Sequence, residues 1–186
     1  MRARNWILTC LICLARLTFT AQAQDAGQWA ARAPLPAALS EVSVVELNGK
    51  IHVFGGSVLG FTGPYHLEYD PNIDKWRPRG AVPRSLDHMG AAVLNGKIYL
   101  VGGFIGGVTH NDGQNVAMEY DPVLDSWRLL APMKAGRGSV GLAALNGKLY
   151  AIGGRDATGA TVPTNEVYDP ATNRWNSLAP LPRARD

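Results

Sequence analysis

A ten-residue segment that occurs three times constrains the fold more than any other feature of this sequence. Leu94–Gly103 reads Leu-Asn-Gly-Lys-Ile-Tyr-Leu-Val-Gly-Gly, and Leu47–Gly56 and Leu145–Gly154 are close copies of it. A segment that returns at a nearly constant spacing indicates a supersecondary unit that stacks on its own copies. The chain is therefore expected to be a repeat protein with a core that runs from one copy to the next.

Each copy predicts a β-hairpin followed by a crowded backbone. Asn-Gly between two apolar runs favours a two-residue turn, because both residues tolerate the positive φ that this turn requires. In the second strand of the middle copy, Ile98 and Leu100 point to one face, and Tyr99 and Val101 point to the other. Both faces are apolar, so the sheet is expected to be covered on both sides. The Gly-Gly pair predicts a close approach of another backbone segment.

Two further strands complete each unit. A third strand ends in Tyr-Asp-Pro, and a Trp seven residues after the Tyr opens the fourth strand. The three Trp residues are 51 and 48 residues apart, and four antiparallel strands in such a length indicate a β-propeller blade. The acidic or amide residues that follow Tyr-Asp-Pro are interpreted as turn residues rather than metal ligands, because they recur once per unit: Asp74, Asp125 and Asn173.

These motifs resemble the kelch repeat, and the resemblance covers essentially all of residues 28–186. It implies an all-β, kelch-type β-propeller with three four-stranded antiparallel blades at about 40–80, 86–132 and 137–180. It also implies a lone fourth strand at 27–33 and the start of a further blade at 181–186. The residues expected to have a structural role in every repeat are Gly55, Gly56, Gly102, Gly103, Gly153, Gly154, Tyr69, Tyr120, Tyr168, Trp29, Trp76, Trp127 and Trp175.

The sequence departs from the repeat pattern at a few positions. His52 stands where the later units have Tyr99 and Tyr150. In the third unit Glu166 precedes the Tyr by two residues, whereas the corresponding Glu of the first two units precedes it by one. Arg137 lies nine residues before its turn Asn, where the earlier units carry Leu.

The number of blades does not complete a ring. The resemblance implies a closed ring of six or seven blades. The sequence contains three complete blades and stops within a further repeat. One explanation is a longer reading frame with further C-terminal blades. The other is self-association of two copies into a six-bladed ring, although the spare N-terminal strand of each copy counts against it. The first explanation is preferred.

Residues 1–23 have the pattern of a secretory signal peptide. Arg2 and Arg4 precede a mostly apolar run, and Ala21-Gln22-Ala23 is a small-residue cleavage site. The protein is therefore expected to be exported, either secreted or periplasmic, with no membrane span after cleavage. An N-terminal membrane anchor or a buried helix is the less favoured alternative.

Removal of this leader changes the charge and the cysteine content. The 18 Lys and Arg residues fall to 15, which equals the number of Asp and Glu residues. A neutral mature chain gives no reason to expect a nucleic-acid partner. Both cysteines, Cys10 and Cys13, lie in the leader, so the mature chain has no disulfide and no Cys ligand for a metal. No cofactor and no metal are expected.

Strand alternation places the variable loops and the linkers between blades at one end of the sheets, which is the better candidate for binding. The loops are residues 57–66, 104–115 and 155–164. The candidate ligand contacts in the loops and linkers are Arg84, Asp87, His88, His110, Asp112, Arg137, Arg155 and Asp156. Each has a structural alternative. His110 and Asp112 fit a polar loop tip, Arg84, Asp87 and His88 fit a linker that packs blade against blade, and Arg137 fits a structural Arg that binds neighbouring carbonyls.

The expected function is a non-catalytic module that binds a protein or glycan partner through these loops. No residue is assigned a catalytic role. One alternative comes from other proteins that the repeats resemble, the periplasmic sialic-acid mutarotases, in which acid–base groups line the channel. Other proteins that the repeats resemble are copper radical oxidases, which need a Tyr-Cys cross-link. The mature chain has no Cys, so this segment cannot supply that cross-link. An incomplete fragment without function is the remaining alternative.

Overall fold

The computed structural model describes residues 27–106, 110 and 112–186. The chain divides into two units, Met1–Ala31 and Arg32–Asp186. The predicted signal peptide lies outside the described residues. Within the described part of the chain, no helix is long and apolar enough to cross a membrane.

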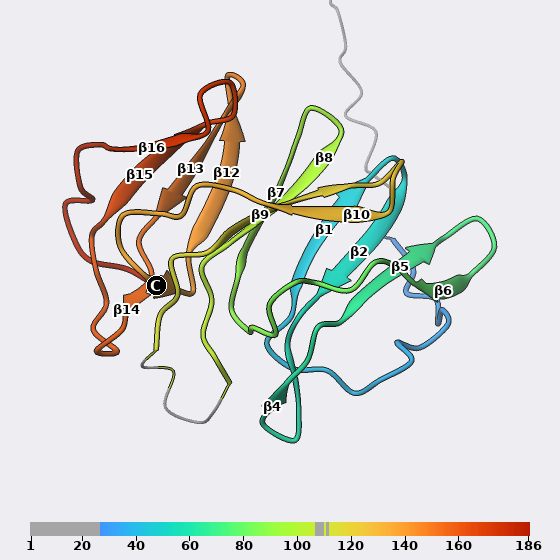
Figure 1. Ribbon diagram of the computed structural model, residues 1–186. Coiled ribbons are helices and arrows are strands. Elements are labelled where there is room, and N and C mark those ends of the chain that lie inside the picture. Colours follow the sequence, from blue (N-terminus) through green and yellow to red (C-terminus); the bar gives the residue numbers. More distant parts are fainter. Residues whose placement is uncertain (1–26, 107–109, 111) are drawn as a thin grey trace, which may run out of the picture. The chain divides into compact units, whose positions relative to one another are not determined.

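The unit Arg32–Asp186 contains three four-stranded antiparallel sheets, which confirms the predicted all-β propeller class (Figure 1). The sheets are named blade 1, blade 2 and blade 3. Blade 1 consists of β1 (Ser43–Leu47), β2 (Lys50–Phe54), β5 (His66–Asp70) and β6 (Lys75–Pro78). Blade 2 consists of β7 (Gly90–Leu94), β8 (Lys97–Val101), β9 (Ala117–Asp121) and β10 (Ser126–Leu129). Blade 3 consists of β12 (Gly141–Leu145), β13 (Lys148–Ile152), β15 (Asn165–Asp169) and β16 (Arg174–Ser177).

The three blades follow one another around a common centre without closing a ring. The first strand of blade 2, β7, contacts both β1 and β12, so the first strands of the blades lie innermost. Two short strand pairs lie in the loops and linkers: β3 (Ser57–Val58) pairs with β4 (Phe61–Thr62), and β11 (Arg137–Gly138) pairs with β14 (Arg155–Asp156).

The Asn-Gly turns have the predicted conformation. Both central residues have positive φ in each copy, for example 52° at Asn95 and 72° at Gly96. The turn keeps the strands in register, with Leu94 opposite Lys97 and Val93 opposite Ile98. This register fixes which side chains of β8 face each neighbouring blade.

The two apolar faces of blade 2 contribute to two separate cores. Ile98 and Leu100 are completely buried in the cluster that joins blade 2 to blade 1. Tyr99 and Val101 belong to the cluster that joins blade 2 to blade 3. Burial of each such side chain contributes about 1.5–3 kcal/mol, so packing between blades supplies much of the stability of this fold.

The Gly-Gly pairs lie where the next blade begins. Gly102 has a φ of +64°, and a Cβ at this position would overlap the carbonyl oxygen of Arg137. The amide of Gly103 donates a hydrogen bond of 3.1 Å to the same oxygen. Gly56 and Gly154 make the matching bonds to the carbonyls of Leu86 and Arg185. The predicted close approach of backbones is therefore present in all three blades.

The repeated Tyr and Trp attach each blade to the tail of the preceding segment. Trp127 donates from Nε1 to the carbonyl of Gly80 at 2.7 Å, and Tyr120 donates from its hydroxyl to Asp125 Oδ1 at 2.6 Å. The amide of Gly80 donates to the same Asp125 oxygen at 2.8 Å. The corresponding bonds of the other two blades involve Tyr69, Asp74, Trp76 and Ala33, and Tyr168, Asn173, Trp175 and Ala131.

The predicted lone strand at 27–33 is not present, and Trp29 is fully exposed rather than packed like the other repeated Trp residues. A fourth strand needs the third strand of its own blade as a hydrogen-bonding partner, and the described residues contain no such strand for it. Ala33 nevertheless binds Asp74 and Trp76 through its backbone, as Gly80 and Ala131 do in the later blades.

Candidate binding site on the loop face

The end of the sheets that carries the post-Gly-Gly loops and the linkers, here called the loop face, has a short chain of backbone bonds near its centre. Glu41, His88 and Ser139 each lie two residues before the first strand of a blade, and each has a positive φ between 49° and 61°. His88 donates its amide proton to the carbonyl of Glu41 at 3.2 Å, and Ser139 donates to the carbonyl of His88 at 2.9 Å. These left-handed residues therefore link the entrances of the three blades.

Asp87 is held against the loop that follows β8. Asp87 and Phe104 exchange two backbone hydrogen bonds of 3.0 and 3.1 Å, and Phe104 is completely buried. The rings of His88 and His110 lie edge to face, 4.6 Å apart, and both pack against Phe104. The buried phenyl ring thus forms an apolar base on which the two imidazoles rest.

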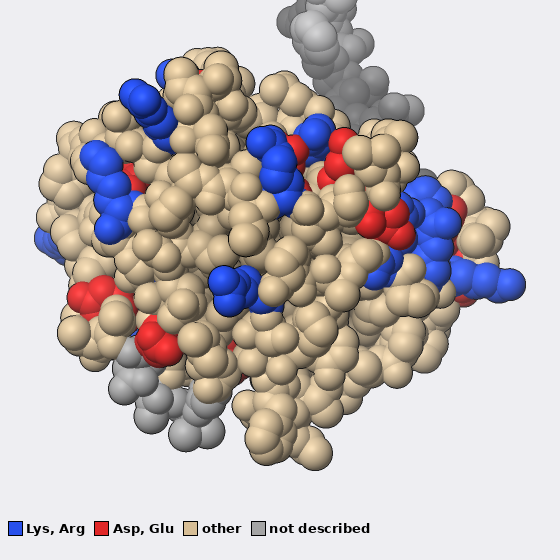
Figure 2. All heavy atoms as spheres, in the orientation of Figure 1, with Lys and Arg blue, Asp and Glu red and all other residues tan. Residues whose placement is uncertain are grey.

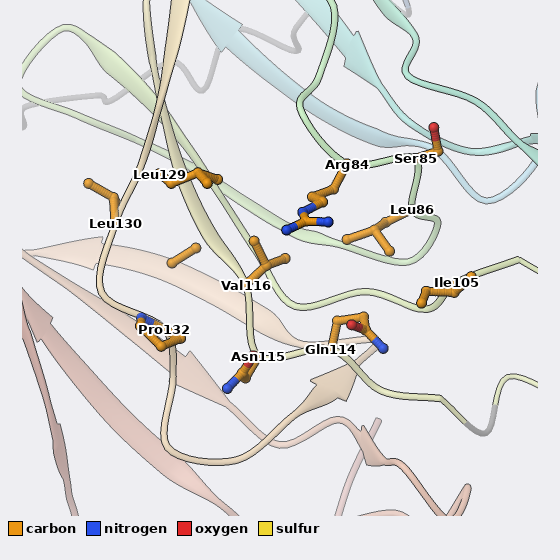
Figure 3. A pocket seen from close by; sticks show the side chains of 11 residues that line it. Arg84, Ser85, Leu86, Ile105, Gln114, Asn115, Val116, Leu129, Leu130 and Pro132 are labelled. Carbon is orange, nitrogen blue, oxygen red and sulfur yellow. The ribbon is translucent and has the colours of Figure 1, made fainter.

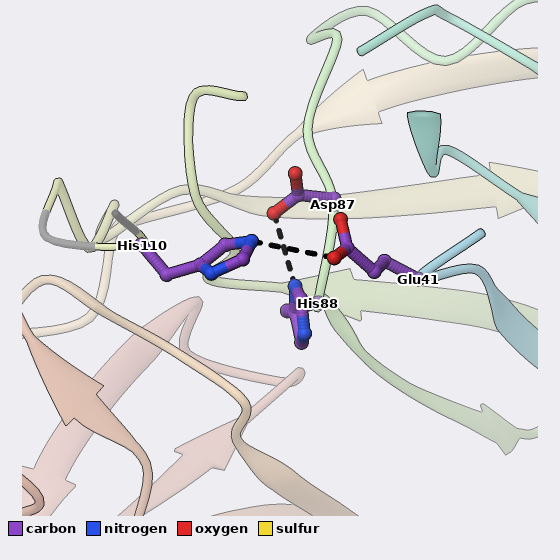
Figure 4. A group of neighbouring side chains, drawn as sticks. All are labelled: Glu41, Asp87, His88 and His110. Carbon is purple, nitrogen blue, oxygen red and sulfur yellow. Dashed lines mark hydrogen bonds and ion pairs between the residues drawn. The ribbon is translucent and has the colours of Figure 1, made fainter. Parts of the chain in front are cut away.

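Four polar side chains converge at this place (Figure 4). His88 Nδ1 lies 3.1 Å from Asp87 Oδ1, and His110 Nε2 lies 3.5 Å from Glu41 Oε1. Each of the four residues offers one nitrogen or oxygen atom, and no two of these atoms are more than 4.8 Å apart. The sequence predicted Asp87 and His88 as linker candidates and His110 as a candidate in a loop, and the fold brings the three together with Glu41.

The carboxylate of Asp87 is buried without full compensation. Its side chain is 1% exposed, and among the described residues its Oδ2 atom has no hydrogen-bond partner. Burial raises the pKa of Asp87, and the hydrogen bond to His88 opposes this rise. An acidic oxygen held out of water in this way is a favourable partner for a positively charged group.

Arg84 lies at a second feature of the loop face, a pocket of about 410 Å³ (Figure 3). Its guanidinium group points into the pocket beside Val116. Four segments line the pocket: the linker between blades 1 and 2, Ile105 in the loop after β8, the residues that lead into β9, and the end of β10 with the residues that follow it. The lining residues are Arg84, Ser85, Leu86, Ile105, Gln114, Asn115, Val116, Ala117, Leu129, Leu130 and Pro132.

Arg137 is not available to a ligand, and its prediction as a ligand contact is wrong. Its side chain is 0% exposed, and its Nη1 atom donates to Glu166 Oε1 at 2.7 Å. Its Nη2 atom donates to the carbonyl of Ala151 at 3.0 Å, as expected of a structural Arg. Burial lowers the pKa of the Arg137 guanidinium, and the charge of Glu166 opposes this effect.

The remaining predicted residues lie in loops and do not join either feature. Asp156 accepts hydrogen bonds from the hydroxyl and the amide of Thr158 and from the amide of Ala160. These bonds, the one from the hydroxyl most of all, lower the pKa of Asp156. Arg155 donates to the carbonyl of Gly159. Asp112 is exposed and accepts a hydrogen bond from Gln114. These contacts are those of loop-forming residues.

The sequence did not predict Glu41 or the apolar lining of the pocket as parts of a site. Alignment of the three repeats on the turn Asn places Glu41, His88 and Ser139 at one position, seven residues before that Asn. This alignment is the signal that would have found Glu41. The pocket has no such signal, because Leu129 and Ile105 resemble ordinary strand and loop residues.

Charge is mixed on the face of the molecule shown in Figure 2. Lys and Arg residues lie singly or beside Asp and Glu, and they do not merge into one continuous basic surface. A nucleic-acid partner would be expected to need such a surface.

The chain is similar to several kelch proteins. It is 34% identical over 163 residues to Kelch repeat and BTB domain-containing protein 12 of Danio rerio, which is 84% of this chain and 19% of that protein. It is 37% identical over 67 residues to an F-box/kelch-repeat protein of Arabidopsis thaliana, which is 36% of this chain and 18% of that protein. The chain thus spans about a fifth of the length of these curated relatives.

A solved structure has the same fold. The structure of YjhT superimposes with a TM-score of 0.71 at 20% identity, over 83% of this chain and 56% of that chain. The model of the Kelch motif matches residues 87–134 and 136–182, which together make up just over half of the sequence. With three blades built on the same Gly-Gly, Tyr-Asp-Pro and Trp positions, the chain belongs to the kelch repeat family.

Proposed function

We propose that this protein is an exported, non-catalytic binding module that recognises a protein partner through the loop face. The observation that carries this proposal is the pocket beside Arg84. Its volume of about 410 Å³ lies within the usual range for ligand sites. The relatives named above carry kelch repeats as part of longer F-box or BTB proteins, which supports a role as one module.

The lining of the pocket favours one kind of ligand. Leu86, Val116 and Leu129 offer an apolar surface, while Arg84 and Gln114 offer hydrogen-bond donors at its edge. Such a surface suits an aliphatic side chain that lies next to a carboxylate, as in an acidic peptide or a chain terminus. No aromatic ring belongs to the described lining, so a sugar ring would find no flat surface to stack on.

A peptide selection on the full-length chain tests this function. Random displayed peptides should yield sequences in which an aliphatic residue adjoins an acidic one. Arg84→Ala should weaken their binding about 10–100-fold, because a charge-assisted hydrogen bond contributes about 1.5–3 kcal/mol. Arg174→Ala is the matched control, because Arg174 is an exposed Arg in β16, at the opposite end of the sheets.

The same proteins should be applied to a glycan array. Glycan binding that Arg84→Ala abolishes, with no peptide selected, would replace the protein partner by a glycan. Peptide binding that is equally strong in wild type and Arg84→Ala would contradict the proposed site. The alternative of a sugar-modifying enzyme stays a prediction, which the anomerisation rate of reducing sugars would test.

Export rests on the leader-like residues 1–23. Chains recovered from the periplasm or the medium should begin after Ala23, which N-terminal sequencing would show. Recovery of the protein only inside the cell with Met1 intact would contradict this part of the proposal.

A further inference from the structure

We propose that Glu41, Asp87, His88 and His110 form a binding site for a divalent transition-metal ion, with Zn²⁺ as the first choice. The ligand atoms would be one carboxylate oxygen each of Glu41 and Asp87 and one imidazole nitrogen each of His88 and His110, and these atoms all lie within 4.8 Å of one another. The site is separate from the pocket beside Arg84 and does not depend on the proposed partner.

The spacing of these atoms is close to that of a tetrahedral site. Zn–N and Zn–O distances of about 2.0–2.1 Å place neighbouring ligand atoms about 3.3 Å apart. The His88–Asp87 and His110–Glu41 distances are 3.1 and 3.5 Å. No pair exceeds 4.8 Å, so side-chain rotations that close the widest pair by roughly 1.5 Å would complete the site.

Two of the four residues have polar atoms without hydrogen-bond partners. Asp87 Oδ2 and His110 Nε2 are both buried, and neither makes a hydrogen bond to any described residue. The 3.5 Å separation of His110 Nε2 from Glu41 is too long for a well-formed hydrogen bond. Buried polar groups in native proteins are nearly always satisfied, and a cation at the centre of the cluster would satisfy both residues.

The ligand types select the class of metal. Two imidazole nitrogens suit Zn²⁺, Cu²⁺, Ni²⁺ and Fe²⁺, whereas Mg²⁺ and Ca²⁺ prefer sites made of oxygen atoms only. The backbone bonds between Asp87 and Phe104 hold one ligand in place, and the imidazoles pack on the Phe104 ring. Such supporting contacts orient ligands in known metal sites.

A bound ion would join three segments of the loop face. Glu41 precedes blade 1, Asp87 and His88 precede blade 2, and His110 belongs to the loop after β8. The ion would therefore fix this loop to the entrances of two blades. The same loop carries Ile105 and Gln114, which line the pocket beside Arg84.

Zn²⁺ titration by calorimetry on the metal-free, full-length chain tests the site. All proteins should carry Cys10→Ser and Cys13→Ser, because free thiols bind Zn²⁺ themselves. We expect one ion per chain, a higher melting temperature with Zn²⁺, and an absorption spectrum of tetrahedral nitrogen and oxygen coordination with Co²⁺. His110→Gln and Glu41→Gln should each lower the affinity at least about 10–100-fold.

Asp112→Asn is the matched control, because Asp112 is an exposed acid next to the same loop position and outside the cluster. Far-UV circular dichroism of each variant would establish that the fold is intact. If wild type bound Zn²⁺ no more tightly than a variant with both His88→Gln and His110→Gln, the metal site would be ruled out. Equal losses in Asp112→Asn and His110→Gln would also overturn it, since they would indicate nonspecific surface binding.

Discussion

The buried ion pair between Arg137 and Glu166 leads to a quantitative prediction. Their side chains are 0% and 1% exposed, and the two charged groups are 2.7 Å apart. At the matching positions blade 2 has Leu86 and Met118, which are both buried in the cluster between blades 1 and 2. The third blade therefore places a charged pair where the second blade places an apolar pair.

Removal of one partner should be far more damaging than removal of both. Arg137→Leu leaves the Glu166 carboxylate buried, and among the described residues the amide of Lys134 is then its remaining donor. Each single change should lower the free energy of unfolding by about 3–5 kcal/mol, because it leaves an uncompensated buried charge. The double variant with Arg137→Leu and Glu166→Met repeats the arrangement of blade 2. It should unfold with a free energy equal to wild type or about 1–4 kcal/mol higher.

Urea unfolding followed by Trp fluorescence and circular dichroism would measure all four proteins of this double-mutant cycle. The slopes against urea should be equal, so that differences in midpoint report stability. Arg128→Leu is the control, because its side chain is 63% exposed in its ion pair with Glu119. It should cost less than about 1 kcal/mol. The reasoning would be refuted if the free energy of unfolding of the double variant were no higher than that of the less stable single variant.

Three further predictions concern pH, glycine and the turn acid. Burial lowers the pKa of His66 from 6.5 to about 4, so between these two pH values the unfolded chain binds more protons than the folded chain. In urea titrations His66 should contribute a fall of about 3 kcal/mol in the free energy of unfolding as the pH drops from 6.5 to 4. A pH dependence that is unchanged in His66→Gln would contradict this origin. Gly102→Ala should lower the melting temperature much more than Gly96→Ala. Both glycines have positive φ, but only a Cβ at Gly102 would overlap another backbone segment, at the carbonyl of Arg137. Equal losses in melting temperature would disprove the steric argument. Asp125→Asn should lower the free energy of unfolding by less than about 1 kcal/mol, because Asn173 makes the same bonds in blade 3. Asp125→Ala removes these bonds and should lower it by about 1–3 kcal/mol. Similar losses in both variants, measured by urea unfolding, would contradict the proposed role of the Oδ1 atom.

The repeat also explains why the loop face is where a site can form. The Asn-Gly and Tyr-Asp-Pro turns have the same short form in every blade, because their residues suit the backbone conformation and the hydrogen bonds of these turns. The loops after Gly-Gly differ in length and composition, and blade 1 forms the additional pair β3 and β4 in its loop. Differences in loop length and composition, which leave the core unchanged, are thus concentrated at one end of the sheets.

The sequence by itself determined the elements and their order. The informative signals are local or periodic. Asn-Gly predicts a turn, Gly-Gly predicts a close approach of another backbone segment, and the Tyr-to-Trp spacing predicts the third and fourth strands. The two-sided apolar strand Ile98 to Val101 also predicted a sheet covered on both faces, and the two clusters on either side of blade 2 confirm it. These features depend on the identity of a few residues and recur in each copy.

The tertiary structure alone decided what lies together on the loop face. Glu41, His88 and His110 belong to different segments, and only the packing of blade 1 against blade 2 brings their side chains within reach of one another. The same packing buries Arg137 beside Glu166 and so removes it from the candidate site. Side-chain proximity between blades depends on how whole sheets pack, and no local pattern in the chain encodes that distance.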